Sequence, residues 1–185
     1  MKFPYYKAIV VAETILDLVH DSCTRIVIAG SIRRQASEVF DIEILYISHT
    51  TPADADLFGE CAHINLADRA VAAMLHSGLI HQRLNTRGQA IWGKRNKLAI
   101  HTRSGIPIDF FATTEDCWWN YLVCRTGPAE NNIRIATAAK TRGYQWNPYG
   151  PGYTRLHDGQ QVPMTSEAAV FHFVSLPFVP PWDRR

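Results

Sequence analysis

The chain has few cysteines and lacks the patterns that would give them a structural role. Its four cysteines, at positions 23, 61, 117 and 124, form no C-x-x-C pair, and no histidine follows at zinc-finger spacing. A disulfide framework or a structural zinc is therefore not expected, and a reducing, cytoplasmic setting fits best. With 185 residues, of which 46% are hydrophobic, the chain can bury a sizeable core without such cross-links.

Long apolar runs are also missing. No run approaches the roughly 20 residues that a membrane span needs, and the stretch Met1-Lys2-Phe3-Pro4 does not begin a signal peptide. We therefore expect a soluble protein that has no membrane partner.

Positive charge is small overall but unevenly placed. The formal net charge is +2. Residues 81–110 nevertheless hold a single acid and six basic residues, which are Arg83, Arg87, Lys94, Arg95, Lys97 and Arg103. Such a segment can contact a phosphate backbone, although charge runs are more often solvated hairpin faces.

The hydrophobic pattern predicts an α+β fold. Helical spacing indicates helices over residues 4–20, from Asn65 to a stop at Gly78, and over 115–124 and 129–142. Short β-branched runs indicate strands near 25–29, 41–47, 79–84, 97–102 and 106–111. We expect a mixed sheet flanked by helices in residues 1–112 and a small α+β subdomain in residues 113–185.

Three carboxylates stand out on two of these strands. Side chains alternate along a strand, so Asp41 and Glu43 share one face while Ile42, Ile44 and Tyr46 point to the core. Asp109 likewise lies opposite Ile108 and Phe110. If the two strands are neighbours, the three acids converge, and two hard cations such as Mg²⁺ or Mn²⁺ would offset their repulsion. The alternative is a charged, exposed strand edge.

A glycine, a serine and two arginines precede the first acids. Gly30 and Ser31 allow the backbone to turn closely past a phosphate, and Arg33 and Arg34 follow on the same turn. Guanidinium groups bind phosphate oxygens well. This pattern predicts a site for the triphosphate of a nucleotide, bound together with two metal ions.

These motifs carry a resemblance to a known family. Residues 28–34, followed by Asp41-Ile-Glu43, resemble the nucleotidyltransferase signature of DNA polymerase family X, the polymerase beta-like enzymes. Ile108-Asp-Phe-Phe111 looks like the strand with the third acid, and Thr126-Gly127, residues 132–134 and 140–150 look like the thumb motif. The proline-rich end, residues 176–181, is similar to the usual C-terminus, so the resemblance runs from about residue 4 to 185.

The resemblance implies a minimal palm-plus-thumb form of such an enzyme. It implies that Asp41, Glu43 and Asp109 bind two Mg²⁺ ions, for which Mn²⁺ can substitute, and that Asp109 accepts the proton of a primer 3′-hydroxyl. Gly30, Ser31, Arg33 and Arg34 would hold the triphosphate. The resemblance assigns contacts with the nascent base pair or DNA to a set of residues in both parts of the chain: Gly127, Asn132, Arg134, Arg87, Lys94, Arg95 and Lys97.

The chain departs from the family pattern in three places. Phe40 and Gln35 stand where the family often has glycine, and Cys124-Arg125 replaces two aromatic residues that sense the sugar. Weak discrimination against ribonucleotides is therefore expected. We expect deoxyribose-phosphate lyase activity to be absent, since we expect no segment before the palm that could act as the family's lyase domain. Because X-Pro bonds adopt the cis form most cheaply, and the family's turn has a cis bond there, we predict a cis Gly127-Pro128 peptide.

Three functions are compatible with these features. The first is a template-directed, gap-filling repair polymerase that adds a dNTP to a primer on gapped or primer-template DNA, acting as a monomer, and releases pyrophosphate. The second is a template-independent or small-substrate nucleotidyltransferase that uses the same acids. The third is a nucleic-acid-binding module with a decayed site, against which the three intact acids count.

Overall fold

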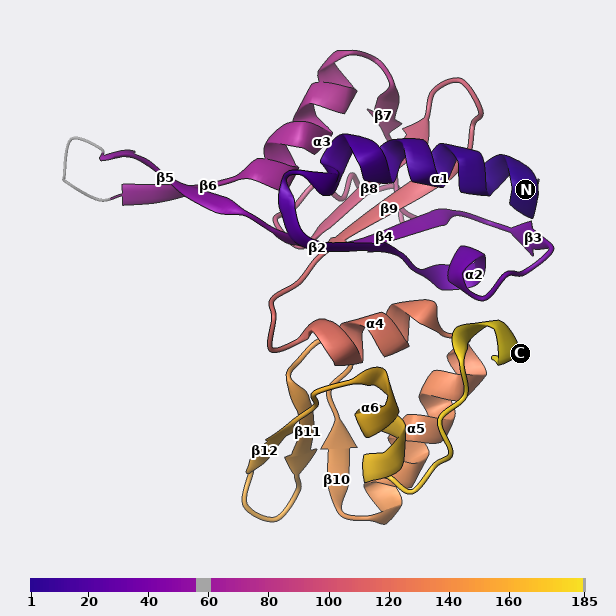
Figure 1. The fold of residues 1–185 in the computed structure, drawn as a ribbon, viewed down its shortest axis with the longest axis vertical. Helices are drawn as coiled ribbons and strands as arrows, with labels where there is room; N and C mark the ends of the chain where they lie inside the picture. Colours follow the sequence, from indigo (N-terminus) through magenta and orange to yellow (C-terminus); the bar gives the residue numbers. More distant parts are fainter. Residues whose placement is uncertain (56–60, 185) are drawn as a thin grey trace.

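The structure, a computed structural model, describes residues 1–55 and 61–184. Two lobes are visible in Figure 1: an N-terminal lobe that comprises β1 to β9, and a smaller C-terminal lobe that comprises α4 to η1. The architecture is α+β with a mixed sheet flanked by helices, which confirms the predicted fold class. The assignment of residues 1–112 and 113–185 to separate domains stays a prediction.

The helices of the N-terminal lobe in the described ranges are α1 (Tyr5–His20), α2 (Gly30–Arg33) and α3 (Leu66–His76). Its strands are β1 (Phe3–Pro4), β2 (Cys23–Ile28), β3 (Glu38–Val39), β4 (Ile42–Ser48), β5 (Thr50–Ala55), β6 (Cys61–Asn65), β7 (Ile80–Gln82), β8 (Asn96–His101) and β9 (Pro107–Ala112).

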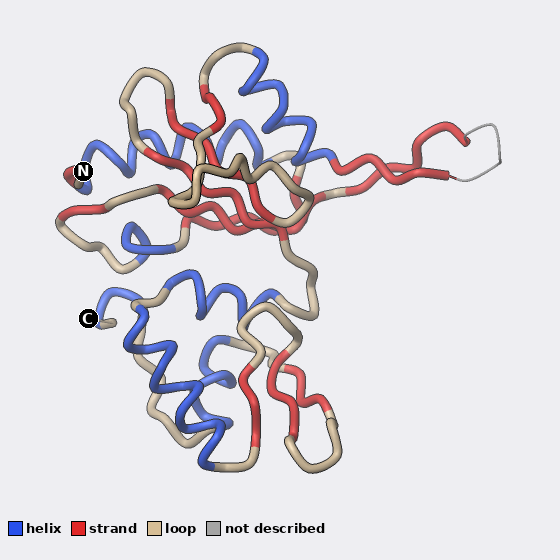
Figure 2. The backbone as a smooth tube through the Cα atoms, turned by 180° about the vertical axis from the view of Figure 1, so that it is seen from behind, coloured by secondary structure: helices blue, strands red, loops and turns tan. Residues whose placement is uncertain are grey.

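The C-terminal lobe contains α4 (Trp118–Thr126), α5 (Ala129–Thr141), α6 (Glu167–Phe173) and the short 3-10 helix η1 (Pro181–Asp183). Its strands β10 (Tyr144–Trp146), β11 (Gly152–Arg155) and β12 (Gln161–Pro163) form a small antiparallel sheet. Figure 2 shows this sheet beside α5 and α6.

A five-stranded sheet in the order β2-β4-β9-β8-β7 is the centre of the N-terminal lobe. The central pair β4 and β9 is parallel, and the other neighbours are antiparallel. The strands that carry the predicted acids are therefore adjacent, as the interpretation of the sequence required. The alternation of side chains then decides which residues face each side.

The two faces of this sheet are covered by different lobes. Ile42, Ile44, Ile108 and Phe110 are fully buried in a core that also contains residues of α1 and α3. On the opposite face, Leu45 and Phe111 pack with three residues of α4, namely Trp118, Tyr121 and Leu122. The C-terminal lobe thus docks on the face to which the acids point, and its own core is separate.

Most predicted elements are present with shifted ends. Pro4 caps α1 in an extended conformation and does not lie inside its first turn. Helix α4 begins at Trp118, later than predicted, because Cys117 still forms a turn with the carbonyl of Thr114. The β5-β6 hairpin was not predicted, and residues 56–60 of the acidic stretch that it contains lie outside the described residues.

Two further expectations concern the backbone and the membrane. The Gly127-Pro128 peptide is cis, which confirms the prediction. Within the described ranges, no helix combines the length and the apolar character needed to cross a membrane.

Candidate active site

Register pairing brings the predicted acids together. In the parallel pair of β4 and β9, Glu43 lies directly opposite Asp109. Asp41 precedes β4 by one residue and lies near both of these acids, since its charge raises the pKa of Glu43 and of Asp109. The acids therefore gather at the sheet face that the C-terminal lobe covers.

Burial and mutual repulsion make the acids of this cluster hard to ionise. Burial is the main reason that the pKa of each of the three carboxyls is raised. For Glu43 the charge of Asp41 adds to burial and raises the pKa to about 8, against the opposing effect of Arg125. A cluster of this kind favours binding of a cation, because a cation relieves the cost of bringing the carboxylates together.

The chemistry of the donors fits a hard divalent cation, since three carboxylates supply oxygen ligands and neither imidazole nor thiolate. With the side chains as they lie, however, the described part of the chain contains no group of three or more His, Cys, Asp or Glu residues that could hold a metal ion. Asp109 is paired with Arg83. One carboxylate oxygen of Asp109, Oδ1, is thus already engaged by an arginine.

Two arginines that were not predicted as site residues contact the acids. Arg83 follows β7 and its Nη2 donates to Oδ1 of Asp109. Arg125, in the last turn of α4, places Nη1 3.8 Å from Oε1 of Glu43. The excess of basic residues in 81–110 and the unusual Cys124-Arg125 pair were visible in the sequence, but neither pointed to an acid partner.

Gly30 allows the loop after β2 to lie against Glu43. Its φ of +62° favours glycine, and a Cβ atom there would overlap Oε2 of Glu43. The backbone N–H of Ala29 donates to the carbonyl of Glu43 at 2.8 Å, and this hydrogen bond holds the same loop against β4. Gly30 and half-buried Ser31, both in α2, are therefore close to the acids, and their contact with a triphosphate stays a prediction.

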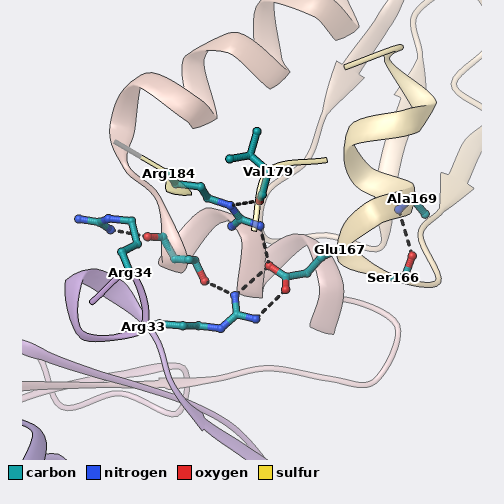
Figure 3. Close-up of polar contacts among 8 residues, drawn as sticks. Arg33, Arg34, Ser166, Glu167, Ala169, Val179 and Arg184 are labelled. Carbon is teal, nitrogen blue, oxygen red and sulfur yellow. Dashed lines mark hydrogen bonds and ion pairs between the residues drawn. The ribbon is translucent and has the colours of Figure 1, made fainter. Parts of the chain in front are cut away.

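Arg33 forms a contact with the C-terminal lobe that was not predicted, as Figure 3 shows. It forms a bidentate ion pair with Glu167, with Nη2–Oε2 at 2.6 Å and Nη1–Oε1 at 2.9 Å, and also donates to Thr126 Oγ1. Arg184 donates to the same carboxylate at 3.2 Å. The structure thus gives Arg33 a role in joining the lobes, through a carboxylate that the local sequence did not reveal, and its contact with a triphosphate stays a prediction.

Arg34 also reaches the other lobe, where its Nη1 donates to the carbonyl of Thr126. Burial lowers its pKa, and the charges of Glu43, Glu130 and Asp41 oppose this effect. Arg34 therefore lies within the field of the acids, and its contact with a triphosphate stays a prediction.

The predicted DNA contacts of the basic segment divide into two groups. Three side chains, those of Arg87, Lys94 and Arg95, are exposed, as contact with the phosphate backbone of DNA requires. Lys97 is not: it is 4% exposed, and its Nζ lies 2.6 Å from Oδ1 of Asp68. The prediction for Lys97 is wrong, because strand alternation on β8 turns this side chain inward to an acid of α3.

The three predicted contacts of the C-terminal lobe lie at the start of α5. Arg134 is exposed, whereas Asn132 is half-buried and donates from Nδ2 to the carbonyl of Cys124 at 2.9 Å. Gly127 is buried, with a φ of +62°. The amide of Asn132 thus already has a partner in the protein, and contacts of these residues with DNA stay predictions.

Comparison with known protein families finds a match in the C-terminal lobe. The family model described as DNA polymerase beta thumb matches residues 121–185. In a comparison with curated proteins, no sequence matches this chain. The match supports a relationship of the C-terminal lobe to the family X polymerases, and it does not reach the strands that carry the acids.

Proposed function

We propose that this protein is a template-directed DNA polymerase of the gap-filling type, which adds a dNTP to a primer 3′-hydroxyl and releases pyrophosphate. One observation carries the proposal: Glu43 and Asp109 lie opposite each other on adjacent parallel strands, on the face covered by a lobe that matches a polymerase thumb. Two independent features, the acids and the thumb, thereby meet at one place.

Each residue of the site has a distinct part in this proposal. Asp41, Glu43 and Asp109 would hold two Mg²⁺ ions, which supply charge stabilisation for an in-line displacement at phosphorus. Asp109 would accept the proton of the primer 3′-hydroxyl as the general base. Ser31 and Arg34 would orient the β- and γ-phosphates beside the acids.

DNA would be held by both lobes. The exposed residues Arg87, Lys94 and Arg95 extend from the hairpin between β7 and β8, and the thumb match suggests that the C-terminal lobe contacts DNA near Arg134. Contacts of this kind position DNA through its phosphates, so affinity should fall steeply with added salt.

A second candidate is a nucleotidyltransferase that selects its acceptor without a template. Arg125 favours it, because this charged side chain lies beside Glu43 where the family resemblance places an aromatic sugar sensor. The two candidates share the acids and differ in whether a template strand selects the nucleotide that is added.

Primer extension separates the candidates. A labelled primer is extended opposite each template base with single dNTPs and NTPs, in Mg²⁺ or Mn²⁺. Addition that follows the template supports the polymerase, addition that ignores it supports the second candidate, and DNA retention without addition would contradict both.

The control uses two matched substitutions. Asp109→Asn should lower the rate at least about a hundredfold, since it removes the base and a ligand. Asp17→Asn, on the exposed outer side of α1, makes the same chemical change away from the site and should leave the rate unchanged. Equal rates for the two variants would contradict the proposed role of Asp109.

A further inference from the structure

A cavity of about 250 Å³ lies in the C-terminal lobe. It is lined by Ala136 and Lys140 of α5, by residues 144–146 of β10, and by Leu156 just after β11. Strand β10 is the edge strand of its sheet and lies beside α5 (Figure 1). The cavity is thus built entirely from the part of the chain that matches the polymerase thumb.

Two aromatic residues of β10 give the cavity fixed walls. Trp146 is 7% exposed, and its indole Nε1 donates to Oδ1 of Asn120 at 3.1 Å, so its one polar group is already satisfied. The ring of Tyr144 packs edge to face against Phe173, with centroids 4.9 Å apart. Both rings are therefore held in place by the protein, and aromatic rings of this kind are surfaces on which nucleobases stack.

Exposed apolar side chains border the cavity. Leu156 is 55% exposed, and its backbone N–H donates to the carbonyl of Gly143 at 2.8 Å, which fixes the turn after β11 beside the start of β10. Ile133 is 64% exposed and lies on α5 one turn before Ala136, on the same face of the helix. A ligand with an apolar ring would remove such side chains from water, which stabilises its binding.

The charge around the cavity is of one sign. Lys140 lines the cavity and is exposed. Residues 131–157 contain no acid and four basic residues, which are Arg134, Lys140, Arg142 and Arg155. A surface of this charge attracts a polyanion. It thus favours a strand of nucleic acid over an apolar peptide, and over a second copy of this chain, whose own basic surface would be repelled.

The volume decides which part of a strand fits. Sites for drug-sized ligands have volumes of about 300 to 1,000 Å³. The cavity is smaller, so it can take one flat ring system while the sugar and the phosphate stay outside. A base inside a duplex is already paired and stacked, and therefore only an unpaired base can enter.

We propose that this cavity holds one unstacked nucleobase of single-stranded DNA, with Lys140 at the neighbouring phosphate. The inference rests on the proposed function in one respect, because it takes the bound strand to be the unpaired template within a gap. The exposed amide of Gln145 supplies hydrogen-bonding groups for the edge of the base. Stacking does not depend on sequence, since every base has a flat face, so the site would hold any template.

The test measures binding of a short fluorescein-labelled oligothymidine to the full chain by fluorescence anisotropy. Ala136→Phe should fill the cavity from α5, and Leu156→Ser should remove its apolar border. Each should weaken binding about tenfold, within the range that one stacked base contributes. Both changes are made at exposed positions, and thermal unfolding shows whether each variant folds, so one remains if the other does not.

Two matched controls make the same chemical changes outside the cavity. Thr137→Phe adds a ring at the next exposed residue of α5, and Leu18→Ser changes a leucine that is 52% exposed on α1. Each should change the affinity less than twofold. Equal weakening in a variant and its control, or no weakening in either cavity variant, would overturn the inference.

An abasic oligonucleotide distinguishes the base from the backbone. It should bind more weakly than the oligothymidine, and Ala136→Phe should leave its affinity unchanged, because no base is lost from the cavity. If Ala136→Phe weakens binding of both strands equally, the cavity does not hold a base and the inference is wrong.

Primer extension separates this inference from the proposed function. If the unaltered protein extends a primer and both cavity variants bind the oligothymidine as tightly as it does, only the inference is wrong. If the oligothymidine binds through the cavity but no primer is extended, the polymerase proposal falls and the base site stands. Altered sedimentation of both cavity variants without DNA, together with unchanged DNA binding, would indicate a second copy in the cavity and overturn the inference.

Discussion

Glu167 holds the two lobes together, and replacing it with glutamine should destabilise the protein strongly. Its carboxylate receives Arg33 from the N-terminal lobe and Arg184 from the end of the chain. The side chains of Arg33, Glu167 and Arg184 are 21%, 11% and 0% exposed. The substitution removes the negative charge and leaves both arginines in place.

The magnitude follows from this burial. Removing one partner of a buried ion pair destabilises a protein by about 3 to 5 kcal/mol, because an uncompensated charge remains. Glutamine keeps the shape and one acceptor oxygen, so we expect the lower value, about 3 kcal/mol. That is a large part of the 5 to 15 kcal/mol by which domains are typically stable.

Urea unfolding followed by tryptophan fluorescence measures the change in the free energy of unfolding. The chain has five tryptophans, and Trp118 lies where α4 meets the sheet of the N-terminal lobe. The slope of free energy against urea should be unchanged if only stability is affected.

Glu115→Gln provides the matched control. Glu115 pairs with Arg25 at 2.9 Å, but the two side chains are 64% and 38% exposed. An exposed pair of this kind contributes about 0 to 1 kcal/mol. If Glu167→Gln loses no more stability than Glu115→Gln, the argument that Glu167 joins the lobes through buried charge is refuted.

Three further predictions concern charge and metal. The hydrogen bond and charge of Arg33, with the charge of Arg184, outweigh burial and lower the pKa of Glu167 from 4.5, so its stabilisation should be present above pH 4.5 and lost as the pH falls below it. A stability difference between the unaltered protein and Glu167→Gln that is equal at pH 3 and pH 7 would contradict this. Because the pKa of Glu43 is raised to about 8, Mg²⁺ binding at pH 7 should release close to one proton from this side chain. Calorimetry would show this release as a binding heat that depends on the ionisation enthalpy of the buffer. A binding heat independent of the buffer would contradict the prediction. Lys94→Met should reduce by about one the slope of the logarithm of DNA affinity against the logarithm of salt concentration. Lys97→Met should instead lower the free energy of unfolding by about 3 kcal/mol, since it leaves Asp68 without its buried partner. The reverse pattern would restore Lys97 as a DNA contact.

The sequence by itself determined the local features. Alternation in residues 41–46 and 106–111 assigned Ile42, Ile44, Ile108 and Phe110 to the core and the acids to the other face, as found. Gly143, with a φ of +76°, follows the end of α5 where a stop was expected. These features follow from periodicity and backbone preference, which depend on residues close together in the chain.

The same reasoning could not decide where long charged side chains find their partners. Arg33 and Glu167 are 134 residues apart, and Lys97 and Asp68 are 29 apart. The identity of a basic residue does not indicate whether its side chain contacts solvent, a phosphate or a buried carboxylate. Lys97 was therefore assigned to DNA, and the pairing of Arg33 with Glu167 was not foreseen.

Only the tertiary structure decided which side chains meet. The parallel pairing of β4 with β9 sets Glu43 opposite Asp109, and the docking of α4 on that face brings Arg125 to Glu43. The acids proposed for the chemistry were thus visible in the sequence, but the ion pairs that two of them form with Arg83 and Arg125 were not. The physical reason is that these contacts arise between elements distant in the chain, whose packing is set by the fold as a whole.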